Sequence, residues 1–422
     1  MVTNKFIITP QDRTCINNKL PNISLLILDK DYLKDAISLK MYLDSKKITP
    51  KVALNIISYI PDKSLSRGKH KVKFIIKFLD GSKKTISWSF KINSSNCKSS
   101  PLDKYNFYYG IPHAHTSLST GKGIPIDAFN YAYKNKLDFL IITDHSRYLN
   151  KRISFNSSDI KKWDLIKRSS MSFSKNHTDF LALSGFEVTS SDYGDFNVIN
   201  TNNLYSEKIK NFSKFTNWLE QSSNPIVFIN HPHKYIENFN YSLRLDKFIN
   251  FIEVGNGCFP TKYLNGEKYY YKLLDNGWHI GAINGQDNHK LNWGDSDNLT
   301  VVISKSLKSK DFFEALNNRR TYSTETKSLK LIFTINDCWM GSKIASNDNS
   351  KLNFRIYAED KKVPIKKVQL LSRGGIVIQE KTSHKKSKIK WDFSLTFKKN
   401  SWYVVRIIHE DGRCGVSSAI FT

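Results

Sequence analysis

Two histidines separated by a single alanine, His113 and His115, are the first side chains in this sequence whose spacing suits a metal ion. They follow the apolar run Phe107–Ile111. Because residues i and i+2 of an extended segment point the same way, both imidazoles can reach one ion. The pair therefore predicts one end of a metal site.

Further histidines and carboxylates lie beside later apolar runs. Each follows such a run or begins the next one: Asp144, His145, Glu187, Asp195, His231, Asp287 and His289. Imidazole and carboxylate ligands without thiolate suit zinc, manganese or iron. A shared carboxylate can hold two ions about 3.5–4 Å apart. We therefore predict a site for divalent metal ions.

The elements that must position these side chains alternate between residues 105 and 324. Short apolar runs such as Phe139–Ile142 alternate with five segments of helical length: Pro125–Asn135, Ser157–Ser172, Lys210–Gln221, Tyr263–Asp275 and Ser309–Asn318. Alternating strands and helices predict an α/β fold with a mostly parallel sheet, and about seven repeats suit a barrel. In such barrels the carboxyl ends of the strands converge on one face, where the candidate ligands would meet.

The flanking regions read as β-structure. Residues 1–95 include Lys71–Leu79 and Lys84–Ile92 on either side of Asp80-Gly81, which predicts a hairpin. This region is similar to bacterial immunoglobulin-like domains, and residues 93–104 are predicted to be a linker. Residues 325–422 are predicted to form a second β-sandwich.

Six segments of the middle region match, in order, the motifs of a known enzyme family. They are HAHTSLSTG (113–121), TDHS (143–146), GFEVT (185–189), NHP (230–232), EVGNG (253–257) and GQDNHKLNWG (285–294). The region resembles the PHP domains, the polymerase and histidinol phosphatase family of metal-dependent phosphoesterases. The tail WYVVRIIHEDGRCGVSSAIFT and the junction RRTYST (319–324) look like the carbaryl-esterase-like branch, the CehA/McbA-type metallohydrolases.

The resemblance implies a distorted (β/α)7 barrel that holds up to three ions. The first ion would be bound by His113, His115, Glu187 and Asp287. Glu187 would bridge to a second ion, which His231 would also hold, and His145 and His289 would hold a third.

Two positions depart from the family pattern. Thr120 stands where the family usually has an acid or a histidine, which would weaken the third ion site. Asp195 stands where a histidine is common. A carboxylate can replace an imidazole as a ligand, with a shift towards harder ions.

The expected chemistry is hydrolysis by metal-bound hydroxide, because divalent ions lower the pKa of bound water toward ~7. Protonation of the leaving group needs an acid within hydrogen-bond reach, and Asp144, His233 and Asp287 are candidates. His233 is better explained as a pocket residue than as a ligand. Arg147 is a candidate for contacting an anionic group.

The leading expectation for function is a phosphoesterase. Hydrolysis of a carboxylic ester or a carbamate is an alternative that the same ligands would serve. A catalytically weak, PHP-like binding protein is another, and Thr120 and Asp195 would support it.

The charge of the chain bears on its partners. The net charge is +27, from 65 Lys and Arg against 38 Asp and Glu. Such a field attracts anions, so a small anionic or ester substrate is expected. Nucleic acid is a less favoured partner, because the sequence shows no continuous basic patch with interleaved aromatics. No membrane span is expected, since no stretch approaches ~20 apolar residues.

The five cysteines are odd in number, widely spaced and without a CxxC pair, so isolated thiols are expected. The first residues contain no apolar run of signal-peptide length. A cytoplasmic location is therefore expected, with a secreted or surface location as the alternative if a signal is missing from this chain. The sequence does not indicate an oligomeric state.

Overall fold

The computed structural model describes residues 6–10, 14–16, 20–27, 32–53, 56–66, 68–92, 105–155, 158–344 and 350–422. The chain divides into two compact units, residues 1–100 and 101–422. The predicted linker at residues 93–104 lies outside the described residues.

The first unit consists of two β-sheets. One has the order β1 (Phe6–Thr9), β3 (Ile23–Ile27), β7 (Ile56–Tyr59) and β6 (Lys51–Ala53). The other has the order β2 (Thr14–Ile16), β9 (Lys83–Ile92), β8 (Gly68–Phe78), β4 (Ala36–Leu43) and β5 (Lys46–Ile48). The predicted hairpin is confirmed, because β8 and β9 pair in antiparallel fashion around Asp80-Gly81.

The alternation of residue types along β8 explains why this unit folds as a sandwich. Val72, Phe74 and Ile76 are buried, whereas Lys71 and Lys73, which alternate with them, are exposed. Successive side chains of a strand point to opposite faces, so the apolar set of β8 faces the other sheet. The resulting core contains residues of both sheets.

The second unit is built around one large mixed sheet of 15 strands. Its first part contains β10 (Asn106–Ile111), β11 (Phe139–Ile142), β14 (Leu181–Thr189), β15 (Asp195–Ile199), β16 (Ile226–Ile229), β17 (Ile249–Cys258), β18 (Lys262–Asn265), β19 (Gly281–Gly285), β20 (Leu299–Ser304) and β21 (Thr321–Thr324). Six α-helices lie in the described residues of this part: α1 (Pro125–Lys134), α2 (Ser146–Leu149), α3 (Lys162–Asn176), α4 (Phe212–Gln221), α5 (Glu267–Asp275) and α6 (Ser309–Asn317).

Two predicted helices have different bounds in the structure. The predicted helix Ser157–Ser172 begins only at Lys162, because β13 (Ser158–Lys161) pairs with β12 (Arg152–Phe155). The predicted helix Tyr263–Asp275 is replaced at its start by β18, which pairs with the end of β17. In both cases, residues that the spacing predicts to be helical form paired strands instead.

The closed (β/α)7 barrel is not confirmed. β19 pairs with β17, but among the described strand pairs no ladder joins β19 to β20. The two strands are linked through Thr300 Oγ1, which accepts from the Asn284 N–H and donates to its carbonyl at 2.9 and 2.8 Å. The described sheet is therefore large and mixed, and the described chain is mostly β.

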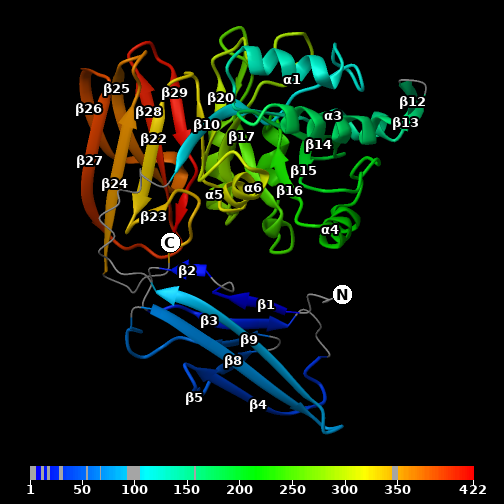
Figure 1. The fold of residues 1–422 in the computed structure, drawn as a ribbon. Helices are drawn as coiled ribbons and strands as arrows, with labels where there is room; N and C mark the ends of the chain where they lie inside the picture. The colour runs from blue at the N-terminus through cyan, green and yellow to red at the C-terminus, as the bar shows by residue number, and fades with distance from the viewer. Residues whose placement is uncertain are drawn as a thin grey trace. The chain divides into compact units, whose positions relative to one another are not determined.

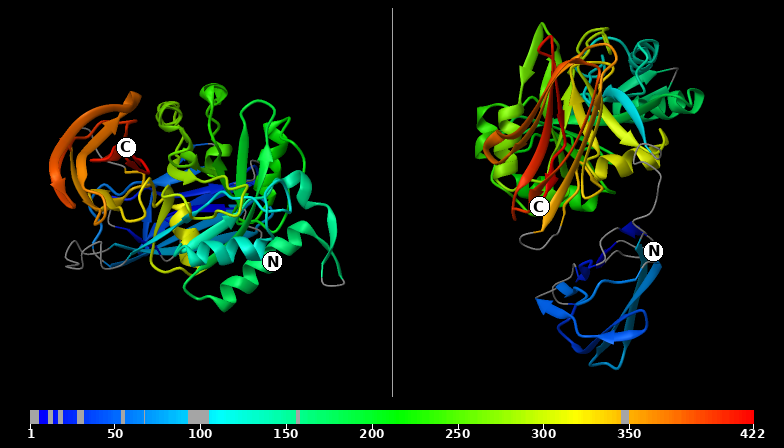
Figure 2. Two further views of the ribbon diagram at one scale, coloured as in Figure 1. Left: turned by 90° about the horizontal axis from the view of Figure 1, so that it is seen from above. Right: turned by 90° about the vertical axis from the view of Figure 1, so that its left-hand side faces the viewer.

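The last hundred residues add two further groups of strands. One sheet has the order β23 (Cys338–Trp339), β22 (Lys330–Ile335), β24 (Lys351–Glu359) and β27 (Lys388–Thr396). The other strands extend the large sheet through β21, in the order β29 (Cys414–Ser417), β28 (Trp402–His409), β25 (Ile365–Ser372) and β26 (Ile376–Lys386), with β30 (Ile420–Phe421) paired to β28. Within this unit, Figure 1 shows α1, α3 and α4 on one side and β24–β28 on the other, and Figure 2 shows the ribbon from two more directions.

The predicted boundary at residues 324/325 falls inside the second unit. Strand pairs join β21 to β29 across it, from Tyr322–Ser417 to Thr324–Gly415. The division into a barrel of 105–324 and a sandwich of 325–422 remains a prediction.

Candidate metal centre

The ends of neighbouring parallel strands form the site. β10, β11 and β14 pair in parallel, as do β16, β17 and β19. β15 is antiparallel to both β14 and β16, so all six of the other strands point the same way. Because β15 runs in the opposite direction, its first residue, Asp195, lies at the edge where the neighbouring strands end.

Backbone hydrogen bonds continue the sheet beyond the strand ends and fix the ligand-bearing segments. The Asp287 N–H donates to the His113 carbonyl at 3.0 Å, and the His115 N–H donates to the Asn288 carbonyl at 2.9 Å. On the other side, the Thr143 N–H donates to the Ala114 carbonyl at 2.8 Å. The HxH segment is therefore held between its two neighbours.

Four side chains converge at the centre of this edge with the spacing of a metal ligand set. The Nε2 atoms of His113 and His115 lie 3.2 Å apart. The Asp287 Oδ1 atom is 3.3 and 3.0 Å from them, and each faces an oxygen of Glu187 at 3.3 Å. Tetrahedral ligands about 2.0–2.1 Å from an ion lie roughly 3.3–3.4 Å apart. The two histidines are thus spaced to bind one divalent cation with either Asp287 or Glu187.

Glu187 is placed to serve more than one ion. It is buried, with 2% of its surface exposed, and it is the third residue from the end of β14. Its Oε1 atom is 3.2 Å from His231 Nε2, and its Oε2 atom is 3.0 Å from His145 Nδ1. Asp195 contributes a further oxygen, 3.9 Å from His231 Nε2. A carboxylate with a different histidine at each oxygen is a suitable bridge between ions.

A third group brings His289 to the same cluster. His115, His145 and His289 each offer a ring nitrogen, and these atoms lie within 4.8 Å of one another. The His289 Nε2 atom is 3.0 Å from the hydroxyl of Thr120. Thr120, which departs from the family pattern, therefore lies next to this group and places a neutral hydroxyl beside His289.

Two of these residues have an unusual backbone conformation. His231 has φ 27° and Asp287 has φ 49°, in the left-handed region that non-glycine residues rarely adopt. Both follow the end of a parallel strand. Strain of this kind is kept where the surrounding structure holds a side chain in a required position.

The charges of the cluster are mutually dependent. Burial disfavours the charged form of His115, yet hydrogen bonds to Asp287 and Glu187 raise its pKa to about 9. Burial opposes ionisation of Asp287, yet His113 and His115 lower its pKa to about 2. Protons on the histidines therefore balance the buried carboxylates, and a divalent cation would replace those protons. The donor set fits such a cation.

The sequence did not single out Glu253 as a site residue. Its fully buried carboxylate accepts from the His113 ring at 2.8 Å through Oε1, and Oε2 accepts from the His231 N–H at 2.6 Å. A carboxylate behind a metal-binding histidine fixes the orientation and tautomer of the ring. The sequence feature that could have identified Glu253 is its place inside the apolar, buried strand β17. A buried carboxylate needs a strong partner to compensate for its charge.

The three candidate catalytic residues lie in different surroundings. The carboxylate of Asp144 is fully buried and accepts from the Thr116 N–H at 2.8 Å and from the hydroxyls of Thr116 and Ser119. It therefore braces the loop after His115. Arg147 is exposed, with its guanidinium 4.8 Å from the Tyr148 ring.

His233 is not a member of any of the metal-binding groups found among the described residues. Its ring lies against the loop before Asp195, because a Cβ on Gly194 would come within 2.9 Å of His233 Nε2. The other candidate ligands, from His113 to His289, are brought together.

Comparisons with solved structures find distant similarities. No protein-family model matches the sequence, and no curated protein matches it. A solved two-domain protein from Bacteroides vulgatus, described as containing a predicted PHP-like metal-dependent phosphoesterase, is 18% identical and covers 75% of this chain and 96% of its own, with a TM-score of 0.45. CopC from Methylosinus trichosporium OB3b is 13% identical over 22% of this chain and 97% of its own, with a TM-score of 0.18. These TM-scores are too low to support a functional assignment. A proposal for function therefore has to rest on the side-chain geometry.

Two further observations concern features outside the site. The three cysteines whose side chains are described, Cys258, Cys338 and Cys414, are free thiols. In the described part of the chain, every helix is too short or too polar to pass through a membrane.

Proposed function

We propose that this protein is a metal-dependent hydrolase of the PHP type, and that its substrate is a phosphoester. The observation that carries the proposal is the pair His113 and His115, whose Nε2 atoms lie 3.2 Å apart and 3.0–3.3 Å from carboxylate oxygens of Glu187 and Asp287. Nitrogen and oxygen donors without thiolate suit Zn, Mn or Fe. One to three ions per chain are proposed.

Two of the chain's own residues would prepare the site. Glu187 would hold two ions at a fixed separation, because its two oxygens face different histidines. Glu253 would keep the His113 ring oriented toward the first ion. When bound, the ions would lower the pKa of a water molecule toward ~7 and polarise the substrate oxygen.

Two cationic side chains close in sequence to candidate ligands favour an anionic substrate. Arg147 follows His145 by two residues, Lys290 follows His289 directly, and both side chains are exposed. A phosphoester carries negative charge before and during the reaction, so these side chains would attract and orient it. Roles for Asp144 and His233 in proton transfer, and the relation to the carbaryl-esterase-like branch, remain predictions.

A substrate panel tests the proposal. Full-length protein reconstituted with Mn²⁺ or Zn²⁺ would be assayed on a chromogenic phosphomonoester, a phosphodiester and a carboxylic ester. We expect turnover of a phosphate substrate, lost in the variant His115→Ala/Glu187→Ala. Turnover of the carboxylic ester alone would favour the ester or carbamate alternative. An unchanged rate in the variant would show that the site is misassigned.

A further inference from the structure

One face of the larger sheet of the first unit carries a dense set of lysines. Register places six of them on the same face of β8 and β9: Lys69, Lys71, Lys73, Lys77, Lys83 and Lys91. Lys40 of β4 and Lys47 of β5 extend the set, because they pair with Ile75 and Tyr42 on that face. Within β4, β5, β8 and β9, all fully described, there is no aspartate or glutamate.

This arrangement is unfavourable for the protein alone. Lys69 lies directly opposite Lys91, and Lys77 lies opposite Lys83. Like charges directly opposite on neighbouring strands are destabilising. A bound anion would relieve the repulsion.

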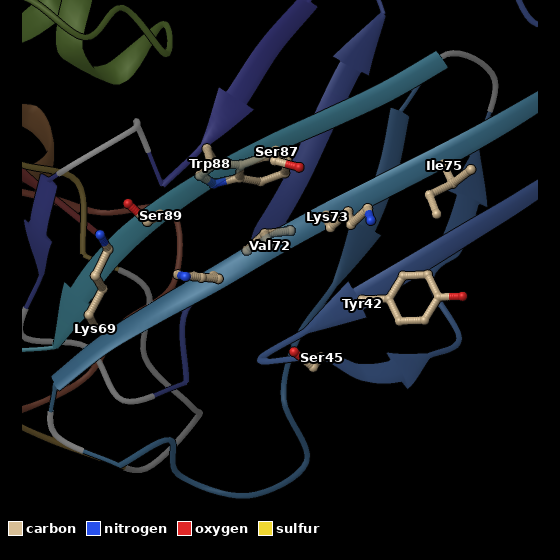
Figure 3. A pocket seen from close by; sticks show the side chains of 10 residues that line it. Tyr42, Ser45, Lys69, Val72, Lys73, Ile75, Ser87, Trp88 and Ser89 are labelled. Atoms are coloured by element: carbon tan, nitrogen blue, oxygen red, sulfur yellow. The ribbon is translucent and has the colours of Figure 1, made fainter. Parts of the chain in front are cut away.

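The face is hollowed rather than flat, and it contains groups other than amines. Lys71, Lys73, Tyr42, Ser87 and Ser89 line the hollow, and Figure 3 shows Tyr42, Lys73 and Ser87 around it. Ser87 and Tyr42 offer hydroxyl groups, and the tyrosine adds the flat surface of a ring. Amines, hydroxyls and one ring on an extended surface are complementary to a polymer that carries both negative charges and hydroxyl groups.

We propose that this face binds an acidic polysaccharide, a carboxylated or sulfated chain lying across the strands. Single-stranded nucleic acid is less suitable, because its binding relies on several aromatic rings that stack on bases. This face offers only Tyr42 among its described outward residues. Trp88 is 4% exposed and stacks on Phe74 on the core side. Double-stranded DNA is read by an element that enters a groove, whereas this face is concave.

The proposal does not depend on the metal site, and binding to full-length protein tests it. Titration calorimetry would use oligogalacturonate and chondroitin sulfate oligomers, a neutral dextran oligomer, oligo-dT, and vesicles with and without phosphatidylserine. The variant Lys71→Gln/Lys73→Gln would be compared with Lys51→Gln/Lys63→Gln, which removes the same charge from exposed lysines elsewhere in the unit.

We expect one or both acidic oligosaccharides to bind, and the first variant to bind about tenfold more weakly than wild type. The control variant should stay within about twofold. Melting temperatures should confirm that both variants are folded. Equal weakening by the two variants, failure of both acidic oligosaccharides, or tighter binding of oligo-dT or anionic vesicles would overturn the proposal.

Discussion

At the scale of single residues, the site depends on groups that touch the ligands as well as on the ligands themselves. Glu253 is the clearest case, because it joins His113 and the backbone of His231 through one buried carboxylate. Both of these histidines are candidate ligands, and they follow different strands, β10 and β16. Glu253 therefore couples the positions of two ligands that lie far apart in the sequence.

Replacing Glu253 by glutamine should weaken metal binding without unfolding the chain. The amide is similar in shape but lacks the charge that holds the His113 ring, and such second-sphere changes cost about 10–100-fold in metal affinity. Competition with a chromogenic chelator would measure the affinity. Glu237→Gln, in an exposed segment, is the control. Equal affinities in all three proteins would refute this role for Glu253.

Asp138 should make stability depend on pH in a direction that is unusual for a carboxylate. Burial raises its pKa to about 6, although the Tyr109 N–H donates to it at 2.7 Å. The pKa of an aspartate in the unfolded chain is about 3.9. Between about pH 4 and pH 6 the folded state therefore binds one more proton than the unfolded state. The stability that protonated Asp138 contributes is fully present below about pH 4 and is lost as the pH rises through about 6.

The variant Asp138→Asn should therefore stabilise the protein above pH 6. The amide oxygen can still accept from Tyr109, and the gain at pH 7.5 should be about 1–2 kcal/mol after allowance for partial exposure. Urea unfolding at pH 7.5 and 4.5 would measure it. The gain should be much smaller at the lower pH, and a gain of equal size at both values would exclude this explanation.

The sequence allowed many of the ligands to be predicted, because His113, His115 and Asp287 each follow an apolar run. The role of Glu253 could not be predicted so directly, since its partner lies 140 positions away. Whether Thr120 meets His289 likewise depends on how two distant loops fold together. Local spacing predicts which residues can bind a metal, and tertiary contacts decide which other residues support them.

At the scale of elements, β19 shows how closely the site is packed. Gly285 ends this strand, and a Cβ at this position would lie 1.8 Å from Glu253 Oε1 and 3.1 Å from the Cβ of His113. Only a residue without a side chain leaves room for that pair. The last residue of the strand therefore protects the geometry of the site.

Gly285→Ala should remove most metal binding, because it displaces Glu253 and His113. Gly281→Ala is the matched control in the same strand, since its Cβ would press on Ser418 and Phe251 instead. We expect the control to lose stability by about 1–3 kcal/mol but to keep its metal. Metal analysis and thermal unfolding of both variants would separate the two effects. Loss of metal in both would mean that β19 as a whole was disturbed.

Alternation of strands and helices predicted most elements of residues 105–324, and α1, α4 and α6 begin within two residues of their predicted starts. The predicted α/β pattern could not show that the sheet continues into the C-terminal strands. That depends on the pairing of β21 with β29, nearly a hundred residues later. Pairing partners so far apart leave no local periodic signal.

At the scale of the whole molecule, the second unit is larger than the predicted middle domain. One hydrophobic core contains β10–β17 residues together with Trp402, Val404 and Phe421. The Trp402 ring N–H donates to Asp275 at 2.9 Å, and Arg406 forms an ion pair with Glu267 at 3.2 Å. The C-terminal strands therefore complete the core on which the metal site is built.

Two truncations test this view. Residues 105–422 should fold, bind metal and hydrolyse substrate at a rate within about twofold of the full chain. Residues 105–324 should fail to fold, because they would expose the apolar surface that the last strands cover. Circular dichroism and thermal unfolding would be the readouts. A folded, metal-binding fragment 105–324 would show that the C-terminal strands form an independent domain.

The most direct test of the central claim is the metal content of the full chain after incubation with Mn²⁺ or Zn²⁺ and removal of free ions. Elemental analysis should find between one and three ions per wild-type chain. Glu187→Gln should lose at least one of them, whereas Glu267→Gln, which alters a buried glutamate bonded to Tyr271 and Arg406, should keep them all. A wild-type chain without bound metal, or equal metal content in wild type and Glu187→Gln, would contradict the account.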